Sequence, residues 1–170
     1  YTSSAASDVY KRQVYLSIGS NKGNRSVLIN KAIDEIDKKI GKIISRTSIY
    51  QSKSWGFDSN DFYNLSLLID TDIEPKSLLI NLKKIEKSMG REDIDGSYSD
   101  RFIDIDILFY DNIIIDSEDL KIPHPKIEIR KFVLVPMLEI ADDYVHPILN
   151  KTIRQLDNEC DDQGIPLKII

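Results

Sequence analysis

The alternation of hydrophobic and polar residues divides the chain into strands and helices between residues 13 and 111. Alternating, β-branched segments predict four strands, at residues 13–20, 42–52, 62–70 and 100–111. Apolar residues three or four positions apart predict two helices, from Arg25 to about Ile40 and from Pro75 to the residue before Gly90. The order is β-α-β-β-α-β. We therefore expect an α+β domain with a ferredoxin-like core, in which helices pack on a mostly antiparallel sheet.

The remaining segments predict additions to this core rather than a second domain. We expect a short strand at 112–116, a proline-rich turn at 122–130, a helix over 132–141 and a short helix near 151–159. The core and these C-terminal helical additions form a single domain, residues 14–160. Residues 1–13 are polar and unpatterned, so we interpret them as a disordered leader or a remnant of gene assembly. We interpret residues 161–170 as a C-terminal tail.

Composition narrows the class of protein. The chain has 170 residues, a formal net charge of −5 and a pI near 5.1, which disfavours a nucleic-acid binder because such a protein needs a basic face. Cys160 is the single cysteine, so no internal disulfide forms. No run reaches the roughly 18 apolar residues of a membrane helix, and the first residues lack the apolar region of a signal peptide. We therefore expect a cytoplasmic protein with no nucleic-acid or membrane partner.

Two acids interrupt the last apolar strand of the core. Side chains two residues apart in a strand share a face, so Asp104 and Asp106 project together. The opposite face carries Ile103, Ile105 and Ile107. Adjacent carboxylates repel unless a cation lies between them, and Mg²⁺ binds through one or two carboxylates plus substrate phosphates. The pair therefore predicts a site that handles phosphates, with a solvent-exposed strand face as the simpler alternative.

Positive residues surround this pair in the sequence. Arg91 and Arg101 flank the loop before the strand, and His124 and Arg130 follow it at the proline-rich turn. A polyphosphate needs such cations near its metal site, since phosphoryl transfer relies on positioning and on neutralising charge. Each arginine taken alone is an ordinary surface residue. Strand parity even places Arg101 on the isoleucine face, so a bend at the loop must turn it towards the acids.

The chain resembles a known enzyme family in several segments that occur in a fixed order. They are SIGSN, FYNLSLLID, IEKSMGR, DRFIDIDILFYDN, IPHP and RKFVLVPMLEIA, between Gln13 and about Asn158. In these segments the chain is similar to the 6-hydroxymethyl-7,8-dihydropterin pyrophosphokinases of folate biosynthesis. The resemblance implies that pyrophosphate moves from ATP, the co-substrate, to the 6-hydroxymethyl group of the reduced pterin and leaves AMP. It also implies two Mg²⁺ ions held by Asp104 and Asp106.

The resemblance further implies roles for individual residues. The catalytic residues would be Arg91, Arg101, Asp104 and Asp106. The ATP contacts would come from Glu86, Arg91, Arg101, Ile107, His124 and Arg130. The pterin contacts would come from Ser52, Lys53, Trp55, Phe62, Asn64 and Phe132, and the pterin ring system would stack between the two phenylalanines. Without the resemblance, ordinary core packing would explain either phenylalanine.

Four positions depart from the pattern of better-known family members. The family often has tyrosine at Phe62, a second arginine at Asp93, tryptophan at Tyr98 and an aromatic residue at Pro125. Loop 91–100 therefore carries less positive charge, which leaves its detailed chemistry and the ATP affinity open. We expect this loop and loop 53–61 to close over the substrates as lids.

Two other functions fit the same topology. Ferredoxin-like domains also serve as RNA-binding or small-molecule sensor modules, but an RNA-binding domain would place aromatic and basic residues on its central strands. Another metal-dependent phosphotransferase or a nucleotide cyclase would use strand-borne aspartates, but would not account for Phe62, Asn64 and Phe132. The sequence contains no P-loop, so ATP binding must depend on arginines and metal ions. We expect a monomer.

Overall fold

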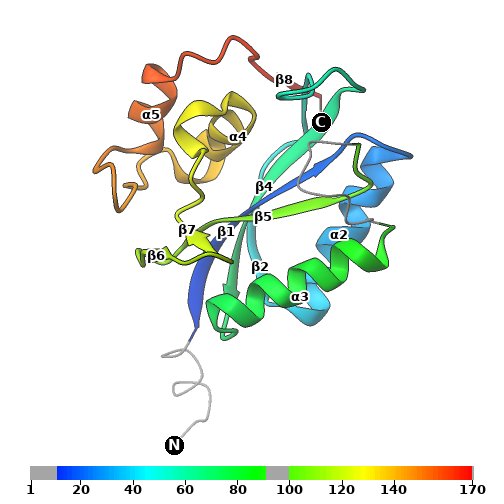
Figure 1. The fold of residues 1–170 in the computed structure, drawn as a ribbon, viewed down its shortest axis with the longest axis horizontal. Coiled ribbons are helices and arrows are strands. Elements are labelled where there is room, and N and C mark those ends of the chain that lie inside the picture. Colours follow the sequence, from blue (N-terminus) through cyan, green and yellow to red (C-terminus); the bar gives the residue numbers. More distant parts are fainter. Residues whose placement is uncertain (1–10, 91–99, 170) are drawn as a thin grey trace, which may run out of the picture.

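The computed structural model describes residues 11–90 and 100–169, which form an antiparallel sheet, a small hairpin and helices on both faces of the sheet (Figure 1). The strands of the sheet are β1 (Arg12–Ser20), β2 (Lys42–Arg46), β3 (Tyr50–Ser52), β4 (Phe62–Thr71), β5 (Asp104–Tyr110) and β8 (Leu167–Lys168). Their order is β5-β1-β4-β3-β8, and β2 also pairs with β4. The hairpin pairs β6 (Ile115–Asp116) with β7 (Lys121–Ile122).

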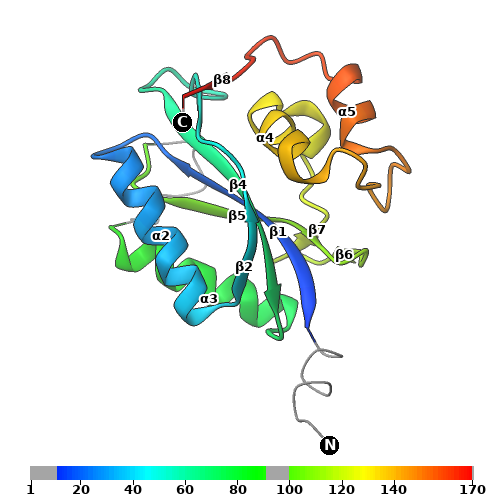
Figure 2. The ribbon, with the colours of Figure 1, turned by 180° about the vertical axis from the view of Figure 1, so that it is seen from behind.

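The helices form two layers. They are α2 (Arg25–Lys39), α3 (Pro75–Ser88), the 3₁₀ turn η1 (Ile127–Ile129), α4 (Lys131–Ala141) and α5 (Ile153–Glu159). α2 and α3 lie on one face of the sheet, and α4 and α5 lie on the other, as Figure 1 and the reverse view in Figure 2 show. The arrangement confirms the α+β prediction with C-terminal helical additions. Among the described residues, no helix is long and apolar enough to span a membrane.

Each face of the sheet has its own hydrophobic core. Leu16 of β1 and Leu82 of α3 belong to the core under α2 and α3. Phe109 of β5 and Leu134 of α4 belong to the core under α4 and α5. Because the central strands β1 and β4 are covered on both sides, their sequences are nearly continuous apolar runs rather than strict alternations.

Strand β5 confirms the parity argument for the two acids. Ile103, Ile105 and Ile107 are all buried in the core under α2 and α3. Since alternate side chains of a strand point to opposite faces, Asp104 and Asp106 lie on the face that α4 covers. The hydrophobic residues therefore fix the orientation of the acids.

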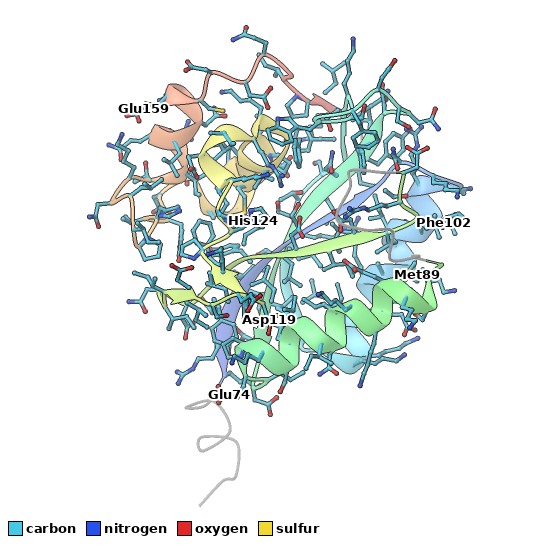
Figure 3. All side chains as sticks on the ribbon, in the orientation of Figure 1. Glu74, Met89, Phe102, Asp119, His124 and Glu159 are labelled. Carbon is cyan, nitrogen blue, oxygen red and sulfur yellow. The ribbon has the colours of Figure 1, made fainter. Side chains whose placement is uncertain are left out.

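Local signals account for the ends of the two core helices. The Asn24 side chain accepts a hydrogen bond from the Val27 N–H at the start of α2, and Pro75 opens α3. Gly90 follows α3 with φ 96°, a conformation that favours glycine. A Cβ atom at Gly90 would lie 3.0 Å from the ring of Phe102, which packs against this end of the helix (Figure 3).

The first strand begins earlier than the predicted domain. Arg12 pairs with Thr71 and Gln13 pairs with Asp70, so these two residues are part of the sheet and not of the expected leader 1–13. The Gln13 N–H donates to Asp111 Oδ1 at 2.9 Å, which holds the start of β1 to the end of β5. The rest of the leader, residues 1–10, lies outside the described residues.

The predicted strand at 42–52 is two strands. Thr47 lies between them, and its N–H donates to the Ser66 carbonyl at 3.0 Å. Its side-chain oxygen accepts from the Ser66 N–H at 3.0 Å, in place of a main-chain carbonyl. The side chain of Thr47 thus replaces a backbone group, and the pairing with β4 is interrupted at this point, between β2 and β3.

Other boundaries also differ from the sequence prediction. The short strand expected at 112–116 is reduced to Ile115–Asp116. The segment expected as a tail, 161–170, contains β8, whose Lys168 pairs with Tyr50. The main sheet therefore extends past the expected domain boundary at residue 160.

Candidate active site

The two acids of β5 lie opposite the smallest residues of β1. Asp104 pairs with Gly19, and Asp106 pairs with Ser17. Small side chains at these positions leave space above the sheet. A Cβ atom at Gly19 would lie 2.9 Å from Asn64 Oδ1, so glycine also lets the neighbouring strand β4 place Asn64 beside the acids.

A cavity opens over this part of the sheet. It is lined by Ser17, Gly19, Ser52, Lys53, Trp55, Phe57, Phe62, Asn64, Arg101, Asp104, Arg130 and Phe132. The structure thus brings together all of the predicted pterin residues with Arg101, Asp104 and Arg130. Ser17, Gly19 and Phe57 were not predicted; the first two could be found only from the register of β1 against β5.

The pterin-side wall is held by hydrogen bonds and ring contacts. Asn64 is buried, and its Nδ2 donates to Ser52 Oγ at 2.7 Å, which orients the amide. Phe57 meets Phe62 edge-on, with ring centroids 6.3 Å apart. The Ser54 hydroxyl donates to the Phe57 carbonyl and so closes the loop on itself. The wall therefore presents a fixed amide next to aromatic rings.

Asp106 lies in a strongly negative, half-buried position. Burial is the main cause that raises its pKa to about 8, and the charges of Asp104 and Glu86 add to the shift. Arg130 and Arg101 counteract it only in part. The nearby arginines therefore do not fully neutralise the charge of the two carboxylates. Such a pair is suited to bind a cation.

Arg101 turns towards the acids, as the sequence required. It lies before β5 rather than in the strand, so strand parity does not apply to it. Its Nη1 donates to Asp104 Oδ1 at 2.9 Å, and both side chains are about three-quarters buried, with 23% and 26% of their surface exposed. Arg101 thus places a fixed positive charge at the edge of the carboxylate pair.

Arg130 lies among aromatic rings at the start of α4. Its guanidinium is 4.7 Å from the ring centre of Trp55 and 5.4 Å from that of Phe132. The residue is buried, and its Nε has no hydrogen-bond partner within the described chain. A buried donor without a partner is costly, so this arginine is suited to receive an anionic ligand.

His124 is neutral at physiological pH. Burial, followed by the charge of Arg130, lowers its pKa to about 4. Its Nδ1 accepts from the Lys126 N–H at 3.2 Å, which leaves the proton on Nε2 as a donor. The backbone N–H of His124 donates to the Leu108 carbonyl at 2.9 Å, which anchors the turn between β5 and α4 (Figure 3).

Two residues predicted to contact ATP, Glu86 and Ile107, have side chains that contact the protein itself. Glu86 is 2% exposed, and its Oε1 accepts from the Ile105 N–H at 2.8 Å, so it covers the open edge of β5. The side chain of Ile107 is buried in the core under α2 and α3, so only its backbone is placed to meet a ligand on the acid face. Arg91 lies outside the described residues. These three contacts stay predictions.

The residues on the acid face fit a hard divalent cation. Asp104 and Asp106 offer only carboxylate oxygens, and Ser17 beside them adds a hydroxyl. Oxygen ligands suit Mg²⁺, which commonly takes one or two carboxylates and completes its coordination with water and phosphate. A cation here would also relieve the repulsion that raises the pKa of Asp106.

Comparison with known proteins identifies the family. Residues 15–142 match the family model of 7,8-dihydro-6-hydroxymethylpterin-pyrophosphokinase (HPPK). The chain belongs to this family. It is 40% identical over 147 residues to the 2-amino-4-hydroxy-6-hydroxymethyldihydropteridine pyrophosphokinase of Aquifex aeolicus, covering 86% of this chain and 91% of that protein. The similarity confirms the resemblance seen in the sequence motifs.

Some of the other relatives are longer proteins, of which this chain matches only a part. The chain is 43% identical to the folic acid synthesis protein fol1 of Pneumocystis carinii, over 82% of this chain but 19% of that protein. A solved HPPK-DHPS structure in complex with substrates shares the fold, with a TM-score of 0.71, 18% identity, and coverage of 87% of this chain and 43% of that one. Wild-type HPPK-DHPS from Plasmodium falciparum with pteroate gives a TM-score of 0.69 at 21% identity, over 88% of this chain and 42% of that one.

Proposed function

We propose that this HPPK domain transfers the pyrophosphoryl group of ATP to 6-hydroxymethyl-7,8-dihydropterin in folate biosynthesis. The observation that carries the proposal is a single cavity in which Asp104 and Arg101 lie beside Phe62, Asn64 and Phe132. Acid and guanidinium groups suit a metal-bound polyphosphate, and aromatic rings with a fixed amide suit a flat heterocycle. The cavity therefore combines the requirements of both substrates.

The pterin would bind at the wall formed by β3, β4 and the start of α4. Phe62 and Phe132 would stack on its ring system, while Asn64, held by Ser52, would bond its polar edge. Lys53 and Trp55 would close the outer side of the cavity. Desolvation of the ring between apolar faces would supply much of the binding free energy.

The triphosphate would bind at the side of the cavity that carries positive charge. Arg101 is already fixed beside Asp104, and Arg130 has an unpartnered donor that a phosphate oxygen would satisfy. His124, protonated on Nε2, would donate a further hydrogen bond without adding charge. Arg91, Glu86 and Ile107 complete the ATP contacts implied by the family resemblance.

Asp104 and Asp106 would hold two Mg²⁺ ions between them and the phosphates. When bound, these ions would neutralise phosphate charge and make the hydroxymethyl group of the pterin a better nucleophile. The chain itself holds the acceptor by stacking and amide contacts, holds the donor by arginines, and excludes water from the cavity. The aspartates are fixed by the burial of the isoleucines that alternate with them.

The transfer is a displacement at the β-phosphorus of ATP. The hydroxymethyl oxygen of the pterin forms a bond to this phosphorus, and the bond from it to the bridging oxygen of the α-phosphate breaks. AMP leaves with that oxygen, and the hydroxyl proton is released to water. Positioning of the two substrates and neutralisation of charge supply the catalysis, as in other phosphoryl transfers.

The acceptor can be tested with two closely related pterins. Purified protein with MgATP should consume ATP in the presence of 6-hydroxymethyl-7,8-dihydropterin. It should not do so with the 6-methyl analogue, which stacks equally well but has no hydroxyl group. Equal consumption of ATP with both pterins, or with neither, would contradict the proposal.

We also propose that the protein acts in the cytoplasm as a monomer and without a nucleic-acid partner. The net charge of −5 supports the last of these, because nucleic-acid binding faces are basic. Sedimentation of the protein over a range of concentrations tests the oligomeric state; a concentration-dependent dimer would contradict it.

A further inference from the structure

The two walls of the cavity come from segments far apart in the sequence. Ser52 ends β3 and Lys53 follows it on one side, while Arg130 and Phe132 lie at the start of α4 on the other. A single stretch of chain, residues 162–169, bonds to the backbone beside both walls. In Figures 1 and 2 it is the last part of the red segment that runs from α5 to β8. We call residues 162–169 the strap.

One end of the strap caps α4. The Lys131 N–H donates to Asp162 Oδ2 at 3.0 Å, and Lys131 lies directly between the cavity residues Arg130 and Phe132. The residue at the N-cap, Arg130, provides no capping bond from its own side chain. Asp162 therefore satisfies a helix N–H from a distance of 31 residues, and its charge suits the positive end of the helix.

The other end of the strap completes the edge of the sheet at β3. Lys168 pairs with Tyr50, Leu167 pairs with Gln51, and the Ile169 N–H donates to the Ile49 carbonyl at 2.9 Å. β3 has only three residues, and without β8 it would be an edge strand. Its last residue, Ser52, is the one that orients Asn64.

A side-chain cluster joins α4, β3 and the strap directly. Glu139 of α4 accepts hydrogen bonds from the Tyr50 hydroxyl and from the Ser48 N–H, the latter at 2.9 Å. Lys168 Nζ lies 3.6 Å from the same carboxylate. The strap thus meets the walls at three points: the Asp162 carboxylate caps α4, the backbone of β8 pairs with β3, and Lys168 meets Glu139 by charge.

We propose that the strap sets the separation of the two cavity walls and thereby the affinity for the planar substrate. The inference rests on the proposed function, since it takes the reduced pterin as that substrate. Asp162 and Ile169 are positioning residues: they hold the backbone next to the cavity residues from outside the cavity. Among the described residues, the part of the phosphate side built on β5 and Arg101 has no bond to the strap and keeps its geometry when the strap is released. Arg130 is the one proposed phosphate contact beside the strap, because it precedes Lys131.

Two variants release one end of the strap each. Asp162→Ala removes the cap on Lys131, and Ile169→Pro removes the N–H that bonds Ile49. The matched controls are Asp161→Ala, which changes the same charge on an exposed neighbour, and Ile169→Ala, which keeps the N–H. For each, the KM for the pterin, the KM for ATP and kcat are measured. Amide hydrogen exchange is followed in peptides 48–56 and 130–137, with 14–20 and 104–110 for comparison.

Release of either end should raise the KM for the pterin about fivefold, the effect of one lost helix cap, and leave kcat within about twofold. The KM for ATP should stay within about twofold for Ile169→Pro, and should rise for Asp162→Ala, which releases the backbone next to Arg130. Exchange should accelerate in peptides 48–56 and 130–137 alone, and both controls should match the wild type. An unchanged KM for the pterin despite faster exchange would overturn the proposal. Equal loss of protection in 14–20 and 104–110 would also overturn it, because the strap would then stabilise the whole domain. Absence of pterin-dependent turnover in the wild type would instead contradict the proposed function, and the exchange data would still test the strap.

Discussion

Asn21 and the cavity residue Arg101 are joined by two hydrogen bonds. The Arg101 N–H donates to Asn21 Oδ1 at 2.7 Å, and the Asn21 N–H donates to the Arg101 carbonyl at 3.1 Å. The chain before β5 is therefore held against the end of β1, and Arg101 reaches Asp104 from this bend. Asn21 Nδ2 donates to Asp100 Oδ1 at 2.8 Å and to the Asn60 carbonyl at 3.3 Å, which adds loop 53–61 to the same junction.

Replacing Asn21 should reduce catalysis and also lower the free energy of unfolding by about 1–3 kcal/mol, because the Arg101 N–H loses its partner. Asn21→Ala removes the three side-chain bonds of the bend and keeps the backbone bond to the Arg101 carbonyl, so the position of Arg101 beside Asp104 is less well defined. We expect kcat to fall by about 10- to 100-fold, as for other small displacements of a positioning group. The control is Asn30→Ala, which removes an exposed amide of α2 that bonds Arg46. Equal values of kcat for the two variants in a steady-state assay would show that the junction has no role in catalysis.

Replacing either aspartate should abolish activity and leave the fold intact. Asp104→Asn and Asp106→Asn keep the volume of the side chain and remove the charge needed for the cation, so kcat should fall by about 10³-fold or more. At pH 9, where Asp106 of the wild type is ionised, Asp106→Asn should also raise the melting temperature of the metal-free protein, because it removes repulsion from Asp104 and Glu86. Asp116→Asn, in the exposed hairpin, is the control. A melting temperature below that of the wild type would contradict this account of Asp106.

Replacing Glu86 should lower the stability of the fold more than it affects ATP binding. Glu86→Ala leaves the Ile105 N–H unpaired at the edge of β5, and should lower the free energy of unfolding by about 1–3 kcal/mol. Glu86→Gln keeps an acceptor oxygen and should lose less than Glu86→Ala. Urea unfolding of the three proteins measures the difference. If both variants unfold like the wild type while the KM for ATP rises, the predicted contact with ATP is the main role of Glu86.

His146 should make stability depend on pH below about 6.5. It is 4% exposed, and its Nδ1 accepts from the N–H groups of Ile148 and Leu149, so the folded protein holds it neutral. Burial lowers its pKa in the folded state, whereas the unfolded chain binds a proton below about 6.5. The free energy of unfolding is therefore fully retained above pH 6.5 and decreases as the pH falls, by up to about 1.4 kcal/mol per pH unit for one such group.

The measurement is urea unfolding at several pH values for the wild type and His146→Asn. The asparagine side chain offers an acceptor oxygen near the position of Nδ1 and does not titrate. The variant should show a shallower decrease from pH 6.5 to 5. His124, whose pKa is also lowered, remains in both proteins and does not affect the comparison. Identical slopes would show that His146 is not the titrating group.

Elements whose signal is local could be predicted from the sequence. The apolar residues of α3 recur every three or four positions, so the helix follows from periodicity. The alternate isoleucines of β5 define its buried face, and therefore also the face of the sheet that carries Asp104. The family motifs then identified the residues that the cavity brings together, including Phe62 and Phe132.

Features that depend on pairing between distant segments could not be predicted. The break at Thr47 arises because its hydroxyl bonds Ser66, and nothing in the β-branched sequence around it indicates this. β8 has two residues and a partner strand more than one hundred residues earlier, so its local pattern is that of a tail. Likewise, Ser17 and Gly19 become site residues only through their register with the two acids.

The products formed from ATP test the central claim most directly. Phosphorus NMR of a complete reaction, with MgATP and an excess of 6-hydroxymethyl-7,8-dihydropterin, distinguishes transfer of two phosphates from transfer of one. The account predicts AMP together with an equal amount of a diphosphate ester of the pterin, and no ADP. Formation of ADP with a pterin monophosphate, or release of free pyrophosphate without a pterin product, would contradict it.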